Sequence, residues 1–548
     1  MVQPTGQSLL TRSLLAAALL IAALAALGLT RAATADNSAS DYPAASLAAP
    51  ADQAALIARG KYLVTAADCA PCHTGPNHAP FSGGLVMQTP YGGLASPNIT
   101  PDPTTGIGRW SEADFYKALH NGIAPGHDWL VFPRFLYPAM PYTSYTKLSR
   151  PDVDAIRAYL MSLAPISVAP TPSSMAFPFN QRPVLLGWRL LFFQSGPMAM
   201  NPAWSQDLKN GAYLTEALGH CGECHTPRNL LSAMELSRAY AGAPIDNLFA
   251  PNISSSKTDG VGAWATADLV AYLHDDGNMV KGSPFGAMGE MTDNSTSQLP
   301  LSDDQDIALY LQTATAPQAT PPTSPAPEAA ASISRGQGLY GDNCAACHGA
   351  AGKGMGPNFV PPLAGNSAVT AAQPYNIIGA ALGGLDSWAA NGPAMPAFGA
   401  ALTDQQIADI ANYVRTSWGN SAPPNATAAM VMGLRGAVPL PGAASLAADQ
   451  LGCPRVSASG RPGTVADPGS NLLAIYNGAT PATMPNRTRA LIAQLRAATP
   501  TISEADLADT LLAAYCPVLA DQPGMSLAAK QAALTQFLAG AQPELAGN

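Results

Sequence analysis

The sequence predicts a mainly α-helical protein, built from three tandem copies of one small domain and a C-terminal helical extension. A Cys-x-x-Cys-His motif occurs three times, each time after an apolar stripe at helical spacing. A second helical pattern closes each copy. The chain has 548 residues, which is too long for one compact domain.

The first 35 residues have the pattern of an export signal. Arg12 precedes an apolar run from Leu14 to Leu29, and Ala33-Thr34-Ala35 supplies small residues for cleavage. The alternative is an uncleaved membrane anchor, but the run is slightly short for a spanning helix. We therefore expect residues 1–35 to be a signal peptide. The protein is then periplasmic and peripheral on the inner membrane.

The opening and closing helices mark the ends of each repeat. The opening stripes carry Gly60, Gly211 and Gly336. The closing helices follow Leu148-Ser149, Leu301-Ser302 and Leu402-Thr403, where Ser or Thr before acidic residues is a helix N-cap signature. The predicted segments are the first repeat (51–165), the second repeat (184–313), a Pro/Ala-rich linker (314–331), the third repeat (332–420) and the C-terminal extension (421–548).

The first two repeats share more than the motif. Ser96–Thr100 recurs as Ala250–Ser254, and Gly106–Trp110 recurs as Gly260–Trp264, both 154 residues later. The middle of the domain is therefore duplicated. In the C-terminal extension, Ser503 with Asp506 resembles a capping box, and 528–538 is alanine-rich, so we expect helices there.

Each Cys-x-x-Cys-His motif predicts a covalently bound haem. Two thiols add across the haem vinyl groups, and the adjacent histidine becomes the proximal iron ligand. A zinc site would need a second ligand pair, and a thioredoxin-like dithiol would not explain the histidine. We expect three covalently bound haem c groups. Their cysteines are Cys69, Cys72, Cys221, Cys224, Cys344 and Cys347, and their proximal ligands are His73, His225 and His348.

Methionines are the expected sixth ligands. Met140 lies in Pro-Ala-Met-Pro 67 residues after His73, and Met395 lies in the same tetrapeptide 47 residues after His348. Methionine with histidine raises the haem potential and fills the coordination sphere, which favours electron exchange. In the second repeat we choose Met288 over Met279 and Met291. Histidines are the alternative ligands, namely His78, His120, His127, His220 and His274.

Other features leave alternatives open. Cys453 and Cys516 form a disulfide or remain buried thiols. Trp110 and Trp264 pack in the core or contact a haem propionate. Residues 184–193 form an apolar segment that lies at the membrane surface, against a partner subunit, or inside the protein. The net charge of -9 argues against nucleic acid as a partner class.

These motifs resemble those of a known family, the tri-haem cytochrome c subunits of bacterial membrane-bound dehydrogenases. The resemblance covers 51–418 and includes Pro97–Thr100 with Asp102, Gly106–Gly108, Tyr137–Tyr142 and Pro393–Pro396. It implies three class I cytochrome c domains that pass electrons from a catalytic subunit to ubiquinone or a terminal oxidase. That subunit oxidises an alcohol, aldehyde or sugar with molybdopterin, pyrroloquinoline quinone (PQQ) or flavin. Residues 180–193 favour molybdopterin.

Two other functions compete with the electron relay. One is a free-standing electron carrier. The other is a di-haem-peroxidase-like enzyme with an accessory haem, which needs one iron with an open coordination site. No nucleophile–base pair or phosphate loop accompanies the motifs, so we assign no catalytic residue.

Overall fold

The computed structural model describes most of the three repeats and the helices of the extension. The described residues are 42–47, 50, 52–76, 78–129, 131–245, 247–275, 277–320, 323–355, 360–385, 395–399, 401–435, 456–457, 465–466, 474–476, 483–498, 500, 502, 504–520, 525 and 527–545. The predicted signal peptide, Cys453 and Ser503 lie outside them.

The chain separates into two compact units. The first unit comprises residues 1–73, 81–223 and 228–235, and the second unit comprises 74–80, 224–227 and 236–548. The second repeat therefore contributes to both units, and its chain passes from one to the other at its Cys-x-x-Cys-His motif.

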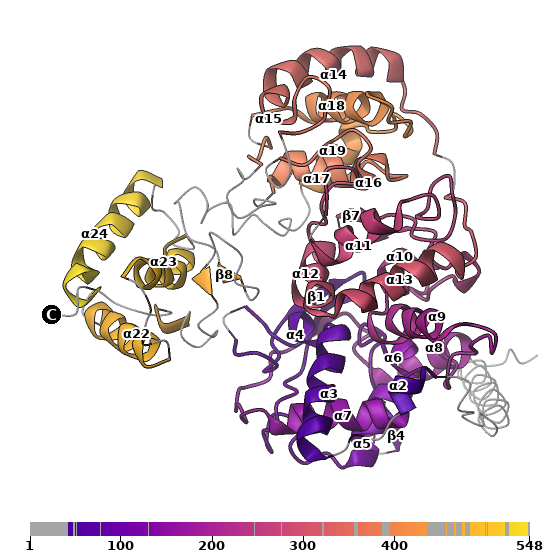
Figure 1. Cartoon of the computed structure of the whole chain (residues 1–548), viewed down its shortest axis with the longest axis vertical. Coiled ribbons are helices and arrows are strands. Elements are labelled where there is room, and N and C mark those ends of the chain that lie inside the picture. Colours follow the sequence, from indigo (N-terminus) through magenta and orange to yellow (C-terminus); the bar gives the residue numbers. More distant parts are fainter. Residues whose placement is uncertain are drawn as a thin grey trace, which may run out of the picture. The chain divides into compact units, whose positions relative to one another are not determined.

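The first unit contains most of the first repeat and the start of the second (Figure 1). Its helices are α2 (Ala44–Leu47), α3 (Gln53–Ala66), α4 (Cys69–Cys72), α5 (Glu112–Asn121), α6 (Tyr142–Tyr145), α7 (Arg150–Ser162), η2 (Arg182–Val184), α8 (Leu185–Phe192), α9 (Gln206–Tyr213) and η3 (Leu214–Leu218). Its strands are β1 (Val86–Thr89), β2 (Gly92–Ala95), β3 (Ile123–Asp128), β4 (Phe132–Phe135) and β5 (Ser174–Met175).

A glycine lets the opening helix α3 approach the closing helix α7. A Cβ atom on Gly60 would lie 2.0 Å from the Ala155 carbonyl oxygen, so no larger residue fits the crossing. Gly336 of the third repeat has the same contact, at 2.0 Å from the Asp409 carbonyl oxygen. The glycine in the repeated stripe thus permits close helix packing.

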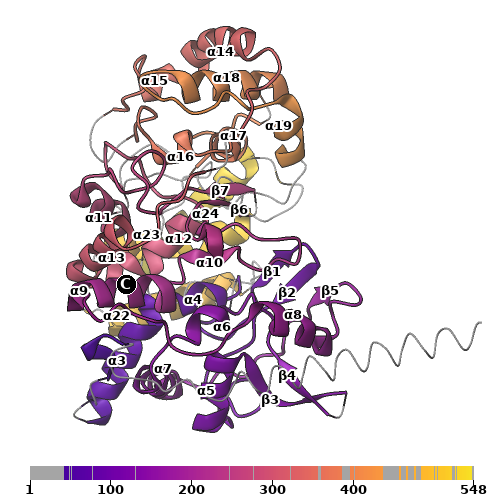
Figure 2. The same ribbon diagram turned by 90° about the vertical axis from the view of Figure 1, so that its right-hand side faces the viewer.

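Two small antiparallel sheets complete the first unit (Figure 2). The order β1-β2-β5 joins the first repeat to residues that follow it, because Gly92 of β2 pairs with Met175 of β5. Strands β3 and β4 form a hairpin whose register shifts between Ala124 and His127.

The second unit contains the rest of the second repeat, the third repeat and the extension. Its helices are α10 (Gly222–His225), η4 (Leu236–Arg238), α11 (Thr266–His274), α12 (Ala287–Asn294), η5 (Thr296–Gln298), α13 (Leu301–Thr313), α14 (Ala329–Asn343), α15 (Ala345–His348), α16 (Ser367–Thr370), α17 (Tyr375–Gly383), α18 (Asp404–Thr416), α19 (Ala428–Arg435), η6 (Ala474–Tyr476), α22 (Met484–Ala498), α23 (Glu504–Ala520) and α24 (Leu527–Leu545). Its strands are β6 (Ala243–Ile245), β7 (Leu248–Ala250), β8 (Val456–Ser457) and β9 (Val465–Ala466).

The predicted fold class is confirmed, because the described residues are mainly helical. Ser149 and Thr403 cap α7 and α18, as expected. Ser302 is not a cap: α13 begins at Leu301 after Pro300, which has no capping side chain. Helix α14 begins at Ala329, so the last residues of the predicted linker are helical.

The C-terminal extension is helical, as predicted. Helices α22, α23 and α24 share a core that includes Leu491, Leu507, Leu511 and Tyr476, all almost fully buried. Cys516 is fully buried and disulfide-bonded. Its predicted partner Cys453 lies outside the described residues, so their pairing remains a prediction.

Candidate haem sites

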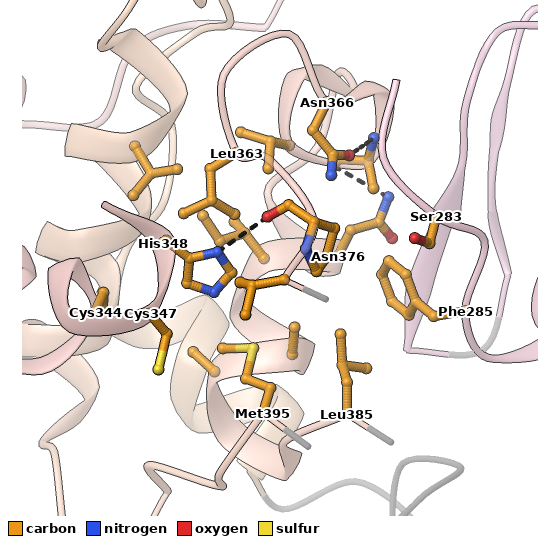
Figure 3. A pocket seen from close by; sticks show the side chains of 18 of the residues that line it. Ser283, Phe285, Cys344, Cys347, His348, Leu363, Asn366, Asn376, Leu385 and Met395 are labelled. Atoms are coloured by element: carbon orange, nitrogen blue, oxygen red, sulfur yellow. Dashed lines mark hydrogen bonds between the residues drawn. The ribbon is translucent and has the colours of Figure 1, made fainter. Parts of the chain in front are cut away.

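The third repeat encloses a cavity of about 400 Å³ around its Cys-x-x-Cys-His motif. Cys344, Cys347, His348 and Met395 all line it. Figure 3 shows the imidazole of His348 and the thioether of Met395 facing the same space, with Cys347 at its edge. Most other lining side chains are apolar, as the apolar faces of a porphyrin require.

Backbone contacts fix the two predicted iron ligands of this site. His348 Nδ1 lies 3.2 Å from the Pro361 carbonyl oxygen. A carbonyl only accepts, so Nδ1 carries the proton and the Nε2 lone pair is left for a metal. Met395 is held by two backbone hydrogen bonds with Leu385, of 2.9 and 3.0 Å.

The other two motif histidines have the same partner. His73 Nδ1 donates to the Pro97 carbonyl at 2.9 Å, and His225 Nδ1 donates to the Pro251 carbonyl at 2.7 Å. All three imidazoles therefore have the tautomer and the orientation that iron ligation requires. Burial lowers the pKa of each of them, which keeps the rings neutral.

The proline carbonyls are themselves held in place. Asn98 follows Pro97, and its side chain donates to the Ile166 carbonyl at 2.7 Å and accepts from the Thr100 N–H at 2.9 Å. Gly83 has a φ of +75°, and a Cβ atom there would lie 2.5 Å from the Pro97 carbonyl carbon. The duplicated Pro-Asn sequence thus builds a loop that orients the histidine, a role that the repeat alone did not reveal.

The first thiols of the first and third motifs, those of Cys69 and Cys344, are partly protected from solvent, whereas Cys72 and Cys347 are exposed. Burial, with Asp68 nearby, raises the pKa of Cys69 to about 12, and burial raises the pKa of Cys344 to about 11. These thiols are therefore poor thiolates, unlike those of redox or zinc sites. The two thiols, the imidazole and the thioether fit a covalently bound haem.

The remaining predicted ligands are partly buried in ordered segments. Met140 lies in the turn between β4 and α6, and its carbonyl accepts from the Tyr142 N–H at 2.7 Å. Met288 lies in the first turn of α12. Ligation of iron by these two methionines, and by the other predicted ligands, remains a prediction.

Helix α12 of the second repeat forms a wall of the third repeat's cavity. Gly289, Glu290, Thr292 and Asp293 of α12 line the cavity, together with Gly286 at the N-cap of this helix. Met288, the predicted sixth ligand of the second site, belongs to the same helix. The second and third candidate sites therefore share one helix, although their motifs are far apart in sequence.

An asparagine joins the second and third repeats beside this wall. The Asn376 side chain accepts from the Phe249 N–H at 2.8 Å and donates to the Phe249 carbonyl at 2.9 Å. Asn376 is 4% exposed, so these bonds are shielded from water. Nothing in the sequence indicated this clamp, because its partners lie 127 residues apart.

Two of the alternative ligands, and one of the two tryptophans, have contacts within the protein. His274 Nδ1 lies 2.8 Å from Asp304 Oδ2, and the His120 ring stacks on Tyr116 at a centroid distance of 4.8 Å. Trp264 packs against Tyr272, with Lys281 over its ring. These contacts favour hydrogen-bonded and packing roles over ligation for His274 and His120, and a packing role for Trp264.

Helix α8 corrects one reading of the apolar segment. None of its residues is fully buried, so it is not a buried helix. Among the residues that the structure describes, no helix has the length and apolar character needed to cross a membrane.

Comparisons with known proteins show which family the sequence is similar to. The cytochrome c family model matches residues 57–164 and 333–418. The gluconate 2-dehydrogenase cytochrome c subunit of Pantoea cypripedii is 37% identical over 74% of this chain and 92% of its own length. The cytochrome c subunit of the alcohol dehydrogenase (quinone) of Gluconacetobacter polyoxogenes is 35% identical over 70% of this chain and 85% of its own length.

A third relative is longer. It is a subunit of the nicotinate dehydrogenase of Pseudomonas putida, 38% identical over 66% of this chain, but the match spans only 30% of that protein.

Proposed function

Because this chain belongs to the family of multihaem cytochrome c subunits of membrane-bound dehydrogenases, we propose that it relays electrons through three covalently bound haems to ubiquinone or another respiratory acceptor. The family is one of electron-transfer subunits, and the oxidation of substrate takes place on a separate catalytic subunit. The observation that carries the proposal is the repeated histidine–proline contact behind each Cys-x-x-Cys-His motif.

The residues of each site have separate roles in this relay. The cysteine pairs anchor the cofactor, and each proline carbonyl orients an imidazole for the iron. Met140, Met288 and Met395 close the sixth position against substrates. A haem with histidine and methionine ligands supplies a one-electron couple at raised potential.

The number of haems is tested by mass. The exported chain should carry three haem masses, and Cys221→Ala with Cys224→Ala should remove one of them. The matched pair Cys344→Ala with Cys347→Ala should remove a different one. A wild-type mass with two haems would refute the second-repeat assignment.

Binding of carbon monoxide distinguishes the electron-relay function from that of a peroxidase-like enzyme. With three filled coordination spheres, the native reduced protein should not bind carbon monoxide. Met395→Ala should create one binding haem and serves as a positive control. Rapid binding by the wild-type protein would favour the di-haem-peroxidase-like alternative.

The partner is identified by purification of the native complex. We propose a molybdopterin-type catalytic subunit that oxidises an aldehyde or alcohol, on the resemblance of residues 180–193, with PQQ and flavin subunits as alternatives. The name of the relative, alcohol dehydrogenase (quinone), supports a quinone acceptor. A flavin or PQQ in the co-purifying subunit would overturn the molybdopterin assignment. A stable monomer without any such subunit would support the free-standing carrier.

A further inference from the structure

Helix α19 lies beyond the region that the cytochrome c family model matches, which ends at residue 418. It nevertheless packs against α17 and α18 of the third repeat (Figure 1). Val431 of α19 is fully buried in a core that includes Ile378 of α17 and Ile407 of α18. The first helix of the C-terminal extension is therefore held against the helices that surround the third candidate site.

A buried asparagine fixes the chain that leads into α19. The side chain of Asn412 accepts from the Ala426 N–H at 2.9 Å and donates to the Ala426 carbonyl at 3.0 Å. Asn412 is fully buried, so water does not compete for these bonds. Helix α19 thus starts from a fixed point on α18.

Arg435, the last residue of α19, connects three points of the third repeat. Its guanidinium donates to Asp404 Oδ1 at 2.7 Å, to the Leu402 carbonyl at 3.0 Å and to the Gly399 carbonyl. Asp404 begins α18, whereas Gly399 and Leu402 belong to the segment that runs from Met395 to this helix. One side chain therefore joins the end of α19 to the segment that carries the predicted sixth ligand.

The residues between Met395 and Gly399 link this contact to the cavity. Met395 and Phe398 both line the cavity. The N–H groups of Phe398 and Gly399 donate to the carbonyls of Ala381 and Leu382 in α17, at 2.8 and 3.2 Å. Only three residues separate Met395 from Gly399, so a displacement of Gly399 also displaces the thioether.

Among the groups of the proposed site, the methionine depends most on such support. The cysteines hold the cofactor covalently, and His348 directly follows one of them, whereas Met395 lies 47 residues after His348. A thioether is a soft neutral donor, and it binds ferric iron more weakly than an imidazole does. Motion of the Met395 segment therefore releases the sixth ligand before the fifth.

We propose that Arg435 is a positioning residue for the third haem, because it holds the segment that keeps the Met395 thioether in the cavity and so excludes other ligands. The inference rests on the proposed electron relay, in which Met395 is the sixth ligand. It adds to that relay a role for the first helix of the C-terminal extension. Without the guanidinium, the carbonyls of Gly399 and Leu402 lose a shared donor, and the segment opens more often.

Imidazole binding to the oxidised haem-loaded protein tests the inference, because imidazole binds only where a methionine has left its iron. The rate at each haem is followed by absorbance after rapid mixing. Met395→Ala should make one phase much faster, which identifies the third haem. Arg435→Gln should accelerate the same phase at least about tenfold, equivalent to about 1.4 kcal/mol, and leave the other phases unchanged.

Two further variants make the result specific. Arg489→Gln is the matched control, because Arg489 also pairs with a carboxylate, that of Glu544 at 3.0 Å, but does so within the C-terminal extension. Its imidazole phases should equal those of the wild type. Asp404→Asn weakens the same contact from the side of α18, and it should accelerate the third-haem phase by a smaller factor than Arg435→Gln.

Specific results would overturn the inference. It fails if the third-haem phase is unchanged in both Arg435→Gln and Asp404→Asn, or if Arg489→Gln accelerates that phase equally. It also fails if Arg435→Gln accelerates all phases alike, because the change then loosens the whole protein. If Met395→Ala alters no phase, the assigned sixth ligand is wrong, and it is the proposed ligation that fails. The two failures are therefore distinguishable.

Discussion

Replacing Asn376 with leucine should loosen the junction between the second and third repeats. Leucine has the same number and branching of side-chain heavy atoms, but it cannot bond to Phe249, whose N–H and carbonyl lose their partner within a buried junction. Each unsatisfied buried group costs about 1–3 kcal/mol, so the pair costs at least about 2 kcal/mol. Local opening of β7 then becomes about 30-fold more frequent.

Hydrogen exchange measures this opening directly, through the amide of Phe249. The matched control is Asn420→Leu, because Asn420 is also buried and bonds only within the third repeat, to Gly365, Leu363 and Val414. We expect faster exchange at Phe249 in the Asn376 variant and wild-type exchange there in the control. Equal exchange at Phe249 in wild type and Asn376→Leu would refute the clamp, as would equal acceleration in both variants.

Three further predictions concern buried groups, namely a carboxyl, a guanidinium and a disulfide. Burial raises the pKa of Asp304 from 3.8 to about 7. Between these two pH values the folded second repeat keeps a proton that the unfolded chain releases. The stability of the second repeat should therefore fall by at most about 4 kcal/mol as the pH rises from about 4 to 7. Asp304→Val should remove that slope in thermal unfolding, and an unchanged slope would contradict the assignment. Arg415 is fully buried, and its guanidinium donates to the carbonyls of Val369 and Pro423. Arg415→Met should therefore lower the unfolding free energy of the third repeat by about 3–5 kcal/mol. A loss below about 1 kcal/mol in a denaturant titration would be inconsistent with this role. Because Cys516 is disulfide-bonded, we expect no free thiol in the unfolded haem-loaded chain. Cys516→Ser should leave one free thiol and destabilise the extension by about 4 kcal/mol. Two free thiols in the wild-type chain would argue against a bond to Cys453.

Local signals in the sequence predicted the local structure well. Ser149 and Thr403 act as caps because each side-chain oxygen accepts a hydrogen bond from the backbone N–H three residues later. This local contact does not depend on where the helix packs. The same reasoning failed at Ser302, since the rigid backbone of Pro300 already starts the helix one residue earlier. The glycine of the opening stripe was visible as a repeated residue, but its function depends on a partner helix. For Gly60, the contact residue Ala155 of that helix lies about 95 residues further along the chain.

The parts of the sites that could not be predicted depend on distant segments. The motifs themselves named the cysteines and histidines, because haem attachment requires them at a fixed local spacing. The proline carbonyls behind His73 and His225 lie 24 and 26 residues further along the chain, and Asn376 meets Phe249 across 127 residues. Only the packed structure determines which carbonyl or strand reaches a given side chain.

The position of α12 has a consequence for anyone who wishes to graft these repeats onto another protein. One residue inserted into this helix would rotate the residues after it by about 100° relative to those before it, which would disturb the wall of the third cavity. The third repeat therefore has to be transplanted together with the second repeat if its cavity is to keep this wall. A screen of single-residue insertions through 287–294 should find fewer tolerated insertions in this helix than in the neighbouring surface loops.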